Sequence, residues 1–312
     1  MGKYVIGVDV GGTTVKLGLF TDGGELLEKW EIPTRTEDNG VNILPDIAKS
    51  IDEKLAGKGI SKSEVEGCGL AVPGPVDEDG VVRRAVNLHW DYFNLEEKAG
   101  ELFGMKVKGG NDASVAALGE AWKGAASAFK SSVMVTLGTG IGGGIIINGR
   151  ILMGVTGAGA EIGHIHVNDD ETIACNCGNH GCIEQYASAT GIARLARERL
   201  AENDDPSCLR SIAKVSAKSV FDAVKKGDKV AIEIAERFGK YLGDMLAQVA
   251  CVVNPDAIVL GGGVSRAGDV LIGYVEKNFQ KNTFHACRGA KFVIASLGND
   301  AGIYGSAKLA LG

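Results

Sequence analysis

The chain contains one short pattern twice: a buried strand, a turn rich in glycine and threonine, and a second apolar strand. The first copy covers residues 4–20 and the second covers residues 133–148. The glycine spacing of the second turn is similar to a dinucleotide-binding loop, but that motif requires a helix directly afterwards. A β-branched apolar run beginning at Ile145 follows instead, so both copies are predicted to be β-hairpins. The repeat predicts an α/β protein with two related halves, whose hairpins could clamp one polyphosphate.

Both turns carry groups that can hold phosphate oxygens. Backbone N–H groups in a tight glycine turn form a concavity that binds anions. The first turn follows Asp9 and contains Gly11, Gly12, Thr13 and Thr14, and the second contains Gly138, Thr139 and Gly140. A simple tight hairpin is the alternative interpretation of each turn.

A cluster of cysteine and histidine residues predicts a metal site. Cys175, Cys177 and Cys182 follow the spacing C-x-C-x₄-C, and His164 lies eleven positions before the first of them. Three thiolates and one imidazole fit a tetrahedral zinc site with no open position, which favours a structural zinc. His166 and His180 are alternative fourth ligands, because spacing alone does not choose among the three histidines. Buried apolar cysteines or a disulfide are the alternatives to a metal.

Two carboxylates flank this cluster and predict a ligand with several hydroxyl groups. Glu161 lies three residues before His164, and Glu184 lies two residues after Cys182. A metal would therefore tie together two loops that each carry a carboxylate. Carboxylates fixed on a rigid scaffold accept hydrogen bonds from several hydroxyls at once. A sugar is the expected ligand.

Three other predicted strands lead into a loop, a polar pair or a glycine run. Gly74 lies in the stiff Pro-Gly-Pro loop after the strand at 67–72. Asp112 lies between a strand at 105–108 and a helix at 113–122, where it is either an N-cap or a general base. The glycines at 261–263 follow the strand at 257–260 and precede a helix, with room for a nucleotide base or ribose. Trp90 is either a sugar-stacking face or an ordinary packing residue.

Composition excludes several classes of protein. The 312 residues allow one large or two medium domains, and the net charge of −6 argues against a general nucleic-acid surface. The strongest apolar run, residues 246–260, is interrupted by Asn254-Pro255-Asp256, so no membrane span is expected. The strand pattern begins by Lys3, which leaves no room for a signal peptide. A reducing cytoplasmic location is expected, where cysteine clusters more often bind metal.

Together these motifs resemble the ROK family of sugar kinases and repressors. The resemblance rests on Asp9-x-Gly-Gly-Thr13, Pro73-Gly-Pro75, Asn111-Asp112, Gly138-Thr-Gly140, Glu161-Ile-Gly-His164, the three cysteines with Glu184, and Gly261-Gly262-Gly263. Within the family, Val86-Asn87-Leu88 followed by Trp90, together with the overall length, is most similar to bacterial glucokinases. His89 stands where glycine is common in those proteins.

The resemblance implies a fold and a division into domains. The implied fold is the α/β, two-domain actin-like ATPase (ribonuclease H-like) fold, with a cleft between the domains. We expect a smaller N-terminal domain over residues 1–117, onto which a C-terminal helix at 299–312 packs, and a larger domain over residues 118–298 with the zinc site. Family members suggest a homodimer or homotetramer.

The resemblance also implies roles for individual residues. Asp112 would be the catalytic base, and Asp9 would act near Mg²⁺ through water. Residues expected to bind the sugar are Gly74, Asn111, Asp112, Glu161, His164 and Glu184. Residues expected to bind ATP are Asp9, Gly11, Gly12, Thr13, Thr14, Gly138, Thr139, Gly140, Gly262 and Gly263. The zinc ligands would be His164, Cys175, Cys177 and Cys182.

The implied reaction is ATP-dependent phosphorylation of D-glucose at O6 to glucose 6-phosphate. Kinases for N-acetylmannosamine, fructose or allose, and use of polyphosphate as donor, are the alternatives within the family. A sugar-sensing regulator that binds DNA needs a helix-turn-helix segment before the first strand. The strand pattern here begins by Lys3, so a non-catalytic sugar-binding regulator is less expected.

Overall fold

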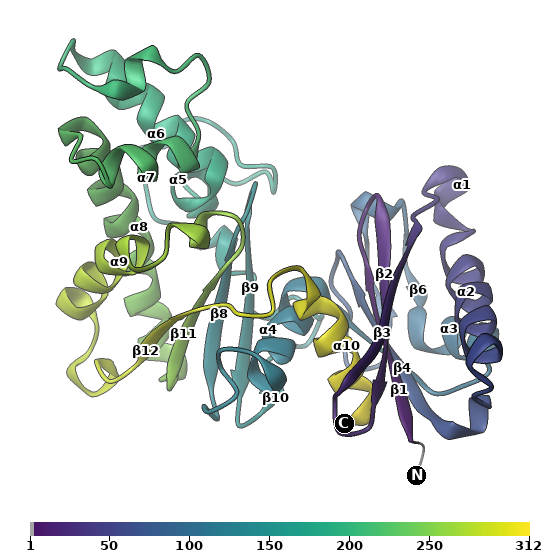
Figure 1. The fold of residues 1–312 in the computed structure, drawn as a ribbon. Helices are drawn as coiled ribbons and strands as arrows, with labels where there is room; N and C mark the ends of the chain where they lie inside the picture. The colour runs from purple at the N-terminus through teal and green to yellow at the C-terminus, as the bar shows by residue number, and fades with distance from the viewer. Residues whose placement is uncertain (1–2) are drawn as a thin grey trace. The chain divides into compact units, whose positions relative to one another are not determined.

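The structure is a computed structural model that describes residues 3–312 (Figure 1). The chain divides into two compact units. The first unit comprises the residues up to Lys130, Gly144–Ala160 and Ser296–Gly312, and the second comprises Ser131–Gly143 and Glu161–Ala295. The domain boundary expected at residues 117–118 stays a prediction.

The first unit is built on a five-stranded sheet in the order β3-β2-β1-β4-β7. Its strands are β1 (Tyr4–Val10), β2 (Thr14–Thr21), β3 (Leu26–Pro33), β4 (Val65–Val72) and β7 (Val107–Asn111), and β5 (Val81–Val82) pairs with β6 (Phe93–Asn94) separately. Its helices are α1 (Glu37–Gly40), α2 (Ile43–Lys58), α3 (Leu95–Phe103), α4 (Asp112–Lys123) and α10 (Ala301–Leu311). Strand β1 pairs antiparallel with β2 and parallel with β4, and β4 pairs parallel with β7.

Both faces of this sheet are covered. On one face, apolar side chains of the strands pack with those of α2 and α3 in a buried core. On the other face lies α10, the last helix of the chain (Figure 1, yellow). Gly7 and Gly69 allow its close approach, since a Cβ atom on Gly7 would lie 2.0 Å from the Ile303 carbonyl oxygen and one on Gly69 would lie 1.8 Å from that of Ser306. The Ser306 hydroxyl also donates a hydrogen bond to the Val8 carbonyl.

The second sheet has the order β10-β9-β8-β11-β12. Its strands are β8 (Ser132–Leu137), β9 (Ile141–Ile147), β10 (Arg150–Ile151), β11 (Ala257–Gly261) and β12 (Lys291–Ile294). The helices of the second unit are α5 (Glu184–Ala187), α6 (Ala189–Glu202), α7 (Ala217–Val224), α8 (Lys229–Val253) and α9 (Asp269–Asn282). Strand β11 pairs parallel with both β8 and β12.

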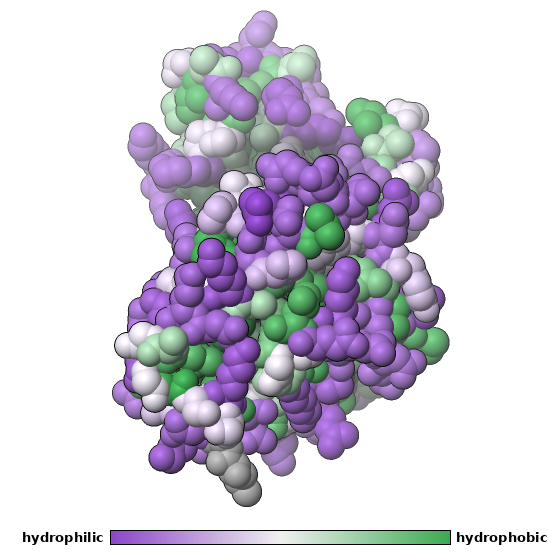
Figure 2. Space-filling model, turned by 90° about the vertical axis from the view of Figure 1, so that its right-hand side faces the viewer, coloured by the Kyte–Doolittle hydropathy of each residue, from purple (hydrophilic) through white to green (hydrophobic). Residues whose placement is uncertain are grey.

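The two sheets have corresponding strand orders, as the sequence repeat predicts. In each sheet a hairpin, β1–β2 or β8–β9, is joined to parallel strands that come later in the chain. Both predicted hairpins are therefore confirmed. Among the described residues, no helix has the length and apolar character needed to span a membrane. The face drawn in Figure 2 is mostly hydrophilic, with hydrophobic side chains in small scattered groups.

Some predicted elements have different bounds. The helical pattern that follows Cys182 forms two helices, α5 and α6, because Ser188 has extended backbone angles and its hydroxyl caps α6 by accepting from the Gly191 N–H. The strand expected at 105–108 is β7, which runs to Asn111. Helix α3 was not predicted from the sequence. A short 3₁₀ turn at Val264–Ala267 separates β11 from α9.

Candidate active site

Three predicted site residues of the first unit lie at the carboxyl ends of parallel strands: Asp9 near the end of β1, Gly74 shortly after β4, and Asn111 as the last residue of β7. The register pairs Asp9 with Ala71, and Val72 with Asn111, so these strands end at one edge of the sheet. Ligands of open α/β sheets bind outside the carboxyl ends of the strands. The Asn111 side-chain amide donates a hydrogen bond of 3.4 Å to the Gly74 carbonyl oxygen. Two residues expected to bind the sugar are therefore in contact.

The N-cap of α4 is Asn111, whose side-chain oxygen accepts from the Ser114 N–H at 3.1 Å. Asp112 is the first residue of the helix, and its Oδ1 accepts from the Ala113 N–H at 2.7 Å. The interpretation of Asp112 as the N-cap is therefore wrong. Because Asn111 caps the helix, the capping function does not account for a carboxylate at position 112.

Asp9 lies near the end of β1 in a half-buried position. Burial raises the pKa of its carboxyl group to about 6, while nearby Lys16 lowers it and the negative charge of Asp112 raises it further. The carboxylates of Asp9 and Asp112 are thus close enough to interact. An acidic pair at a strand edge suits a site that receives a cation.

The turn after β1 directs its carbonyl groups inward. The Gly11 carbonyl accepts from the Thr34 hydroxyl at 2.7 Å, and the Thr13 carbonyl accepts from the Thr34 N–H at 2.9 Å. Gly12 and Thr13 themselves are exposed. Because these carbonyl groups are already bonded, the N–H and hydroxyl groups of the turn are the ones available to bind an anion.

In the second unit, the two glycine turns expected to bind nucleotide are neighbours. They follow β8 and β11, which pair in parallel with Gly261 opposite Thr136. Gly262 has φ of 80°, and a Cβ atom there would lie 2.6 Å from the backbone nitrogen of Leu137. Only glycine suits both this backbone conformation and this close approach.

Helix α6 begins against the first of these turns. The Ala189 N–H donates to the Gly138 carbonyl at 2.8 Å, and the Thr190 hydroxyl donates to the Thr139 carbonyl at 2.7 Å. Sequence reasoning missed this role of Thr190. The Ser-Ala-Thr sequence before an apolar helical pattern is an N-terminal signal that could have located it.

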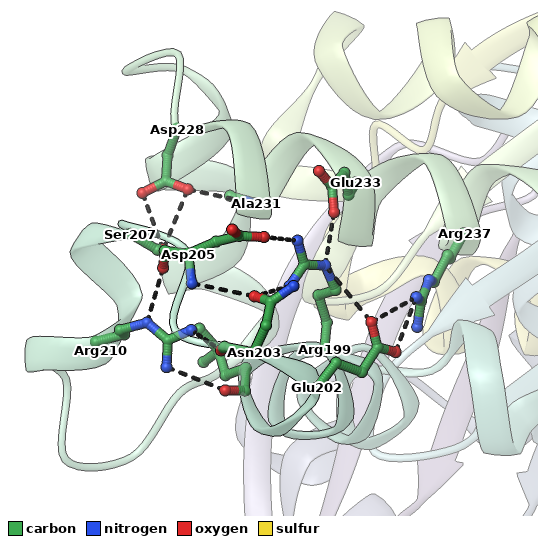
Figure 3. Close-up of polar contacts among 11 residues, drawn as sticks. Arg199, Glu202, Asn203, Asp205, Ser207, Arg210, Asp228, Ala231, Glu233 and Arg237 are labelled. Carbon is green, nitrogen blue, oxygen red and sulfur yellow. Dashed lines mark hydrogen bonds and ion pairs between the residues drawn. The ribbon is translucent and has the colours of Figure 1, made fainter.

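The other end of α6 is fastened to α8 by Arg199. Figure 3 shows this side chain pointing into a group of acidic residues. Its Nε atom donates to Glu233 of α8 and its Nη2 atom donates to Asp205, both at 2.6 Å. Only 4% of Arg199 is exposed, so these paired charges hold α6 in a defined position.

A cavity of about 630 Å³ lies within the second unit and begins at the glycine turns. Its lining includes Thr139, Thr190, Ala193, Arg197, Phe221, Gly263, Val264 and Arg266. Apolar walls with a few cationic and hydroxyl groups are typical of sites for organic anions. The cavity extends beside α6 from Thr190 to Arg197, about 10 Å at 1.5 Å per residue.

The cysteine and histidine cluster forms a compact group of four donors. The ligand atoms of His164, Cys175, Cys177 and Cys182 all lie within 4.8 Å of one another. The Cys177 and Cys182 sulfurs are 3.6 Å apart, and the Cys175 sulfur is 3.8 Å from His164 Nδ1. A tetrahedral zinc with bonds of about 2.3 Å to sulfur has edges of about 3.7 Å, so the group fits this metal.

The geometry also distinguishes the histidines. Both ring nitrogens of His166 have partners at 2.8 Å, the His180 carbonyl oxygen and the Asp169 carboxylate. His166 therefore has no ring nitrogen left to bind a metal, whereas the Nδ1 atom of His164 faces the sulfurs. Neither His166 nor His180 belongs to the group of four.

Glu184 connects this group to the glycine turn. Its Oε1 atom accepts from the Cys175 thiol at 3.0 Å, and its Oε2 atom accepts from the Ile141 N–H at 3.3 Å. Glu161 is exposed at the start of a 3₁₀ turn, Ile162–His164, that places His164. Trp90, by contrast, is buried, donates to the Gly40 carbonyl and packs against Phe93, so it is a packing residue.

Comparison with known proteins identifies the family. The ROK family matches residues 5–312, so the chain belongs to this family, as the sequence motifs predict. It is a sugar phosphotransferase with the two-domain actin-like ATPase fold.

Individual relatives match almost the whole chain. A glucokinase of Halalkalibacterium halodurans is 44% identical over 308 residues, which are 97% of this chain and 93% of that protein. A glucokinase of Thermotoga maritima is 37% identical, over 98% of this chain and 96% of its own length. The crystal structure of a ROK family glucokinase from Streptomyces griseus in complex with glucose and AMPPNP is 33% identical, with a TM-score of 0.74 over 98% of each chain.

Proposed function

We propose that this protein is a glucokinase that transfers the γ-phosphoryl group of ATP to O6 of D-glucose. The observation that carries the proposal is the 44% identity to a glucokinase over 97% of this chain. In the first unit, Asp9, Gly74 and Asp112 lie at the carboxyl ends of the parallel strands, where such a sheet binds ligands, and this supports the proposal. In the second unit, the cavity and Glu184 support it as well.

The cavity in the second unit supports a nucleotide as phosphoryl donor. The phosphates would lie at Gly138, Thr139 and Gly140, where the cavity begins, and the adenosine would lie near Gly262 and Gly263. Phe221, Val264 and other apolar side chains line the cavity, and such walls suit a purine and ribose. An inorganic polyphosphate has no apolar part to place against them. Gly11, Gly12, Thr13 and Thr14 are also proposed to bind ATP.

The residues proposed to bind the sugar are Gly74, Asn111, Asp112, Glu161, His164 and Glu184. Carboxylate and amide groups can orient several hydroxyls simultaneously. The contact between Asn111 and Gly74 supports this assignment, because it fixes the amide that would meet a hydroxyl.

Asp112 is proposed to be the general base. Its carboxylate would accept the O6 proton as the bond from O6 to the γ-phosphorus forms and the bond from that phosphorus to the ADP oxygen breaks. Base catalysis of this kind contributes about 10²–10⁴-fold. Mg²⁺ bound with ATP would neutralise charge on the phosphates. Asp9 would lie on the metal side and interact through water.

The group His164, Cys175, Cys177 and Cys182 is proposed to hold a structural zinc. The soft donor set and the 3.6 Å and 3.8 Å spacings support this metal. Zinc would brace the loop before Glu184 without taking part in phosphoryl transfer. We further propose a cytoplasmic homodimer or homotetramer, on the basis of the family.

The test is ADP release with Mg-ATP over a panel of glucose, N-acetylmannosamine, N-acetylglucosamine, mannose, fructose and allose. We expect the highest kcat/KM with glucose. A clear preference for another hexose would contradict the glucokinase assignment while keeping the kinase mechanism. Absence of turnover with every sugar, in protein that contains zinc, would contradict the proposal as a whole.

A further inference from the structure

Helix α5 has only four residues, Glu184–Ala187, so its own hydrogen bonds cannot fix its direction. Contacts with other segments hold it instead: the Ile183 N–H donates to the Ile165 carbonyl at 2.9 Å, and several side chains add further contacts. The Gln185 amide joins two parts of the metal-binding segment: its oxygen accepts from the Cys182 N–H at 3.1 Å, and its nitrogen donates to the Ile173 carbonyl at 2.8 Å. The position of Glu184 therefore depends on the contacts that hold this short helix, in addition to the hydrogen bonds of its own carboxylate with Ile141 and Cys175.

Tyr186, two residues after Glu184, is anchored by Glu171. The Tyr186 hydroxyl donates to Glu171 Oε2 at 2.5 Å, and Arg194 of α6 donates to the same oxygen at 2.6 Å. The other oxygen, Oε1, accepts from the Ile173 N–H at 3.0 Å. One carboxylate thus joins the loop before Cys175, helix α5 and helix α6.

The surroundings of Glu171 make this anchor rigid. Its side chain is 7% exposed, and that of Arg194 is 17% exposed. The Arg194 guanidinium also lies 4.8 Å from the centre of the Tyr186 ring, which stacks on Tyr241 of α8. The hydrogen bond from Arg194 lowers the pKa of Glu171 to about 2, so the carboxylate is ionised at neutral pH. Charge-assisted hydrogen bonds of this kind are stronger and more directional than neutral ones.

We propose that Glu171 is a positioning residue for Glu184, acting through Tyr186. The four potential metal ligands all precede Glu184, and the last of them is Cys182. Tyr186, which donates to Glu171, follows Glu184 in the chain. Glu184 is therefore fixed from both sides, by the cysteine cluster and by Glu171. The inference rests on the proposed role of Glu184 in binding the sugar.

The main test is Glu171→Gln, which keeps the size of the side chain but replaces one accepting oxygen by an NH₂ group. Gln cannot accept all three hydrogen bonds, so α5 loses part of its anchor. We expect the KM for glucose to rise about tenfold or more, with kcat within about threefold and the KM for ATP unchanged. A purely structural loss of folded enzyme would lower the measured kcat and leave both KM values unchanged.

Glu198→Gln is the matched control. Glu198 also pairs with Arg194, at 3.4 Å, but it is half exposed and does not contact Tyr186. This variant should keep the KM for glucose of the unchanged enzyme. An equal increase in both variants would overturn the inference, because Arg194 and not Glu171 would then be responsible.

A second variant, Tyr186→Phe, tests the path by removing the hydroxyl that donates to Glu171 and accepts from the Asn168 amide at 2.8 Å. It should raise the KM for glucose about threefold or more, and the effect of the double variant with Glu171→Gln should fall well short of the product of the two single effects. If Glu171→Gln does not fold, the increase in Tyr186→Phe still tests the proposal. Additive effects, or an unchanged KM in Tyr186→Phe, would overturn it.

Metal content and Glu184→Gln separate this inference from the proposed function. Zinc bound per chain should be equal in Glu171→Gln and in the unchanged protein, and loss of zinc would overturn the inference. If Glu184→Gln leaves glucose affinity unchanged, the proposed sugar contact fails and the inference fails with it. If Glu184→Gln weakens glucose binding but Glu171→Gln does not, only the inference fails.

Discussion

The Glu184 carboxylate accepts a hydrogen bond from the backbone N–H of Ile141, with 3.3 Å between the oxygen and the nitrogen. Ile141 begins β9, directly after the glycine turn that we assign to the phosphates. The other oxygen of the same carboxylate lies 3.0 Å from the sulfur of Cys175, one of the proposed zinc ligands. One side chain therefore links the proposed sugar, zinc and phosphate sites of the second unit.

This link predicts that Gly140→Ala will impair binding of both substrates. A Cβ atom at Gly140 would lie 2.6 Å from Glu184 Oε2, so the carboxylate would have to move. We expect KM values for glucose and for ATP to rise by about tenfold or more, measured by steady-state kinetics. Gly273→Ala in α9 is the control, because nothing lies within 4 Å of a Cβ atom there. Normal KM values in Gly140→Ala would contradict the link.

Asp112→Asn tests the catalytic base. Because asparagine cannot accept the O6 proton, kcat should fall at least about 100-fold, while glucose affinity measured by calorimetry changes little. Asn111 still caps α4 in this variant, so the helix should remain folded. A kcat within about tenfold of the unchanged enzyme would remove Asp112 from this role.

Cys177→Ser tests the zinc proposal. Loss of one of four ligands should release the metal, lower the melting temperature and abolish glucose binding, because the segment that places Glu184 loses its brace. Zinc content, thermal unfolding and glucose calorimetry measure the three effects. Cys251→Ser is the control, since Cys251 is also exposed but lies outside the group of four. Metal-free Cys177→Ser with full activity would show that the metal does not position the sugar.

Filling the cavity should weaken nucleotide binding alone. Ala193→Leu places a larger side chain on the wall formed by α6. The KM for ATP should rise about tenfold, whereas glucose affinity without nucleotide should be unchanged. The same KM for ATP in Ala193→Leu and in the unchanged protein would show that ATP binds outside this cavity.

Asp9 predicts a dependence of stability on pH. Its pKa in the folded protein is about 6, above the ordinary value of 3.8, because of burial. The folded state therefore binds this proton more tightly than the unfolded chain does, and its contribution to stability is lost as pH rises from about 4 to about 6. At about 1.36 kcal/mol per pKa unit, the loss is at most about 3 kcal/mol.

Asp9→Asn should remove this loss. Urea unfolding should show the variant to be more stable than the unchanged protein at pH 7.5, with a smaller difference at pH 5. Its kcat should fall, because the carboxylate proposed to act near Mg²⁺ is gone. Asp22→Asn, in an exposed turn, is the control and should change neither quantity. A difference in stability that does not depend on pH would contradict the role of burial.

The repeat, most of the longer strands and the composition of the metal cluster could be predicted from the sequence alone, because these depend on local patterns. Strand alternation and glycine turns identify β1–β2 and β8–β9 without long-range information. Cysteine spacing identifies the thiol donors, since ligands close in the chain are close in space. It could not choose His164 over His166, because that choice depends on the partners of each ring nitrogen.

Which distant residues meet depends on the tertiary structure. The contacts of Asn111 with Gly74, of Glu184 with Ile141 and of Glu171 with Arg194 join residues 37, 43 and 23 positions apart. Such pairs depend on strand register and helix packing, which no local pattern encodes. The break at Ser188 has the same origin, because α6 begins where the Ala189 N–H meets the Gly138 carbonyl. The sequence therefore determines which groups are available for chemistry, and the packing of strands and helices determines which of them act together.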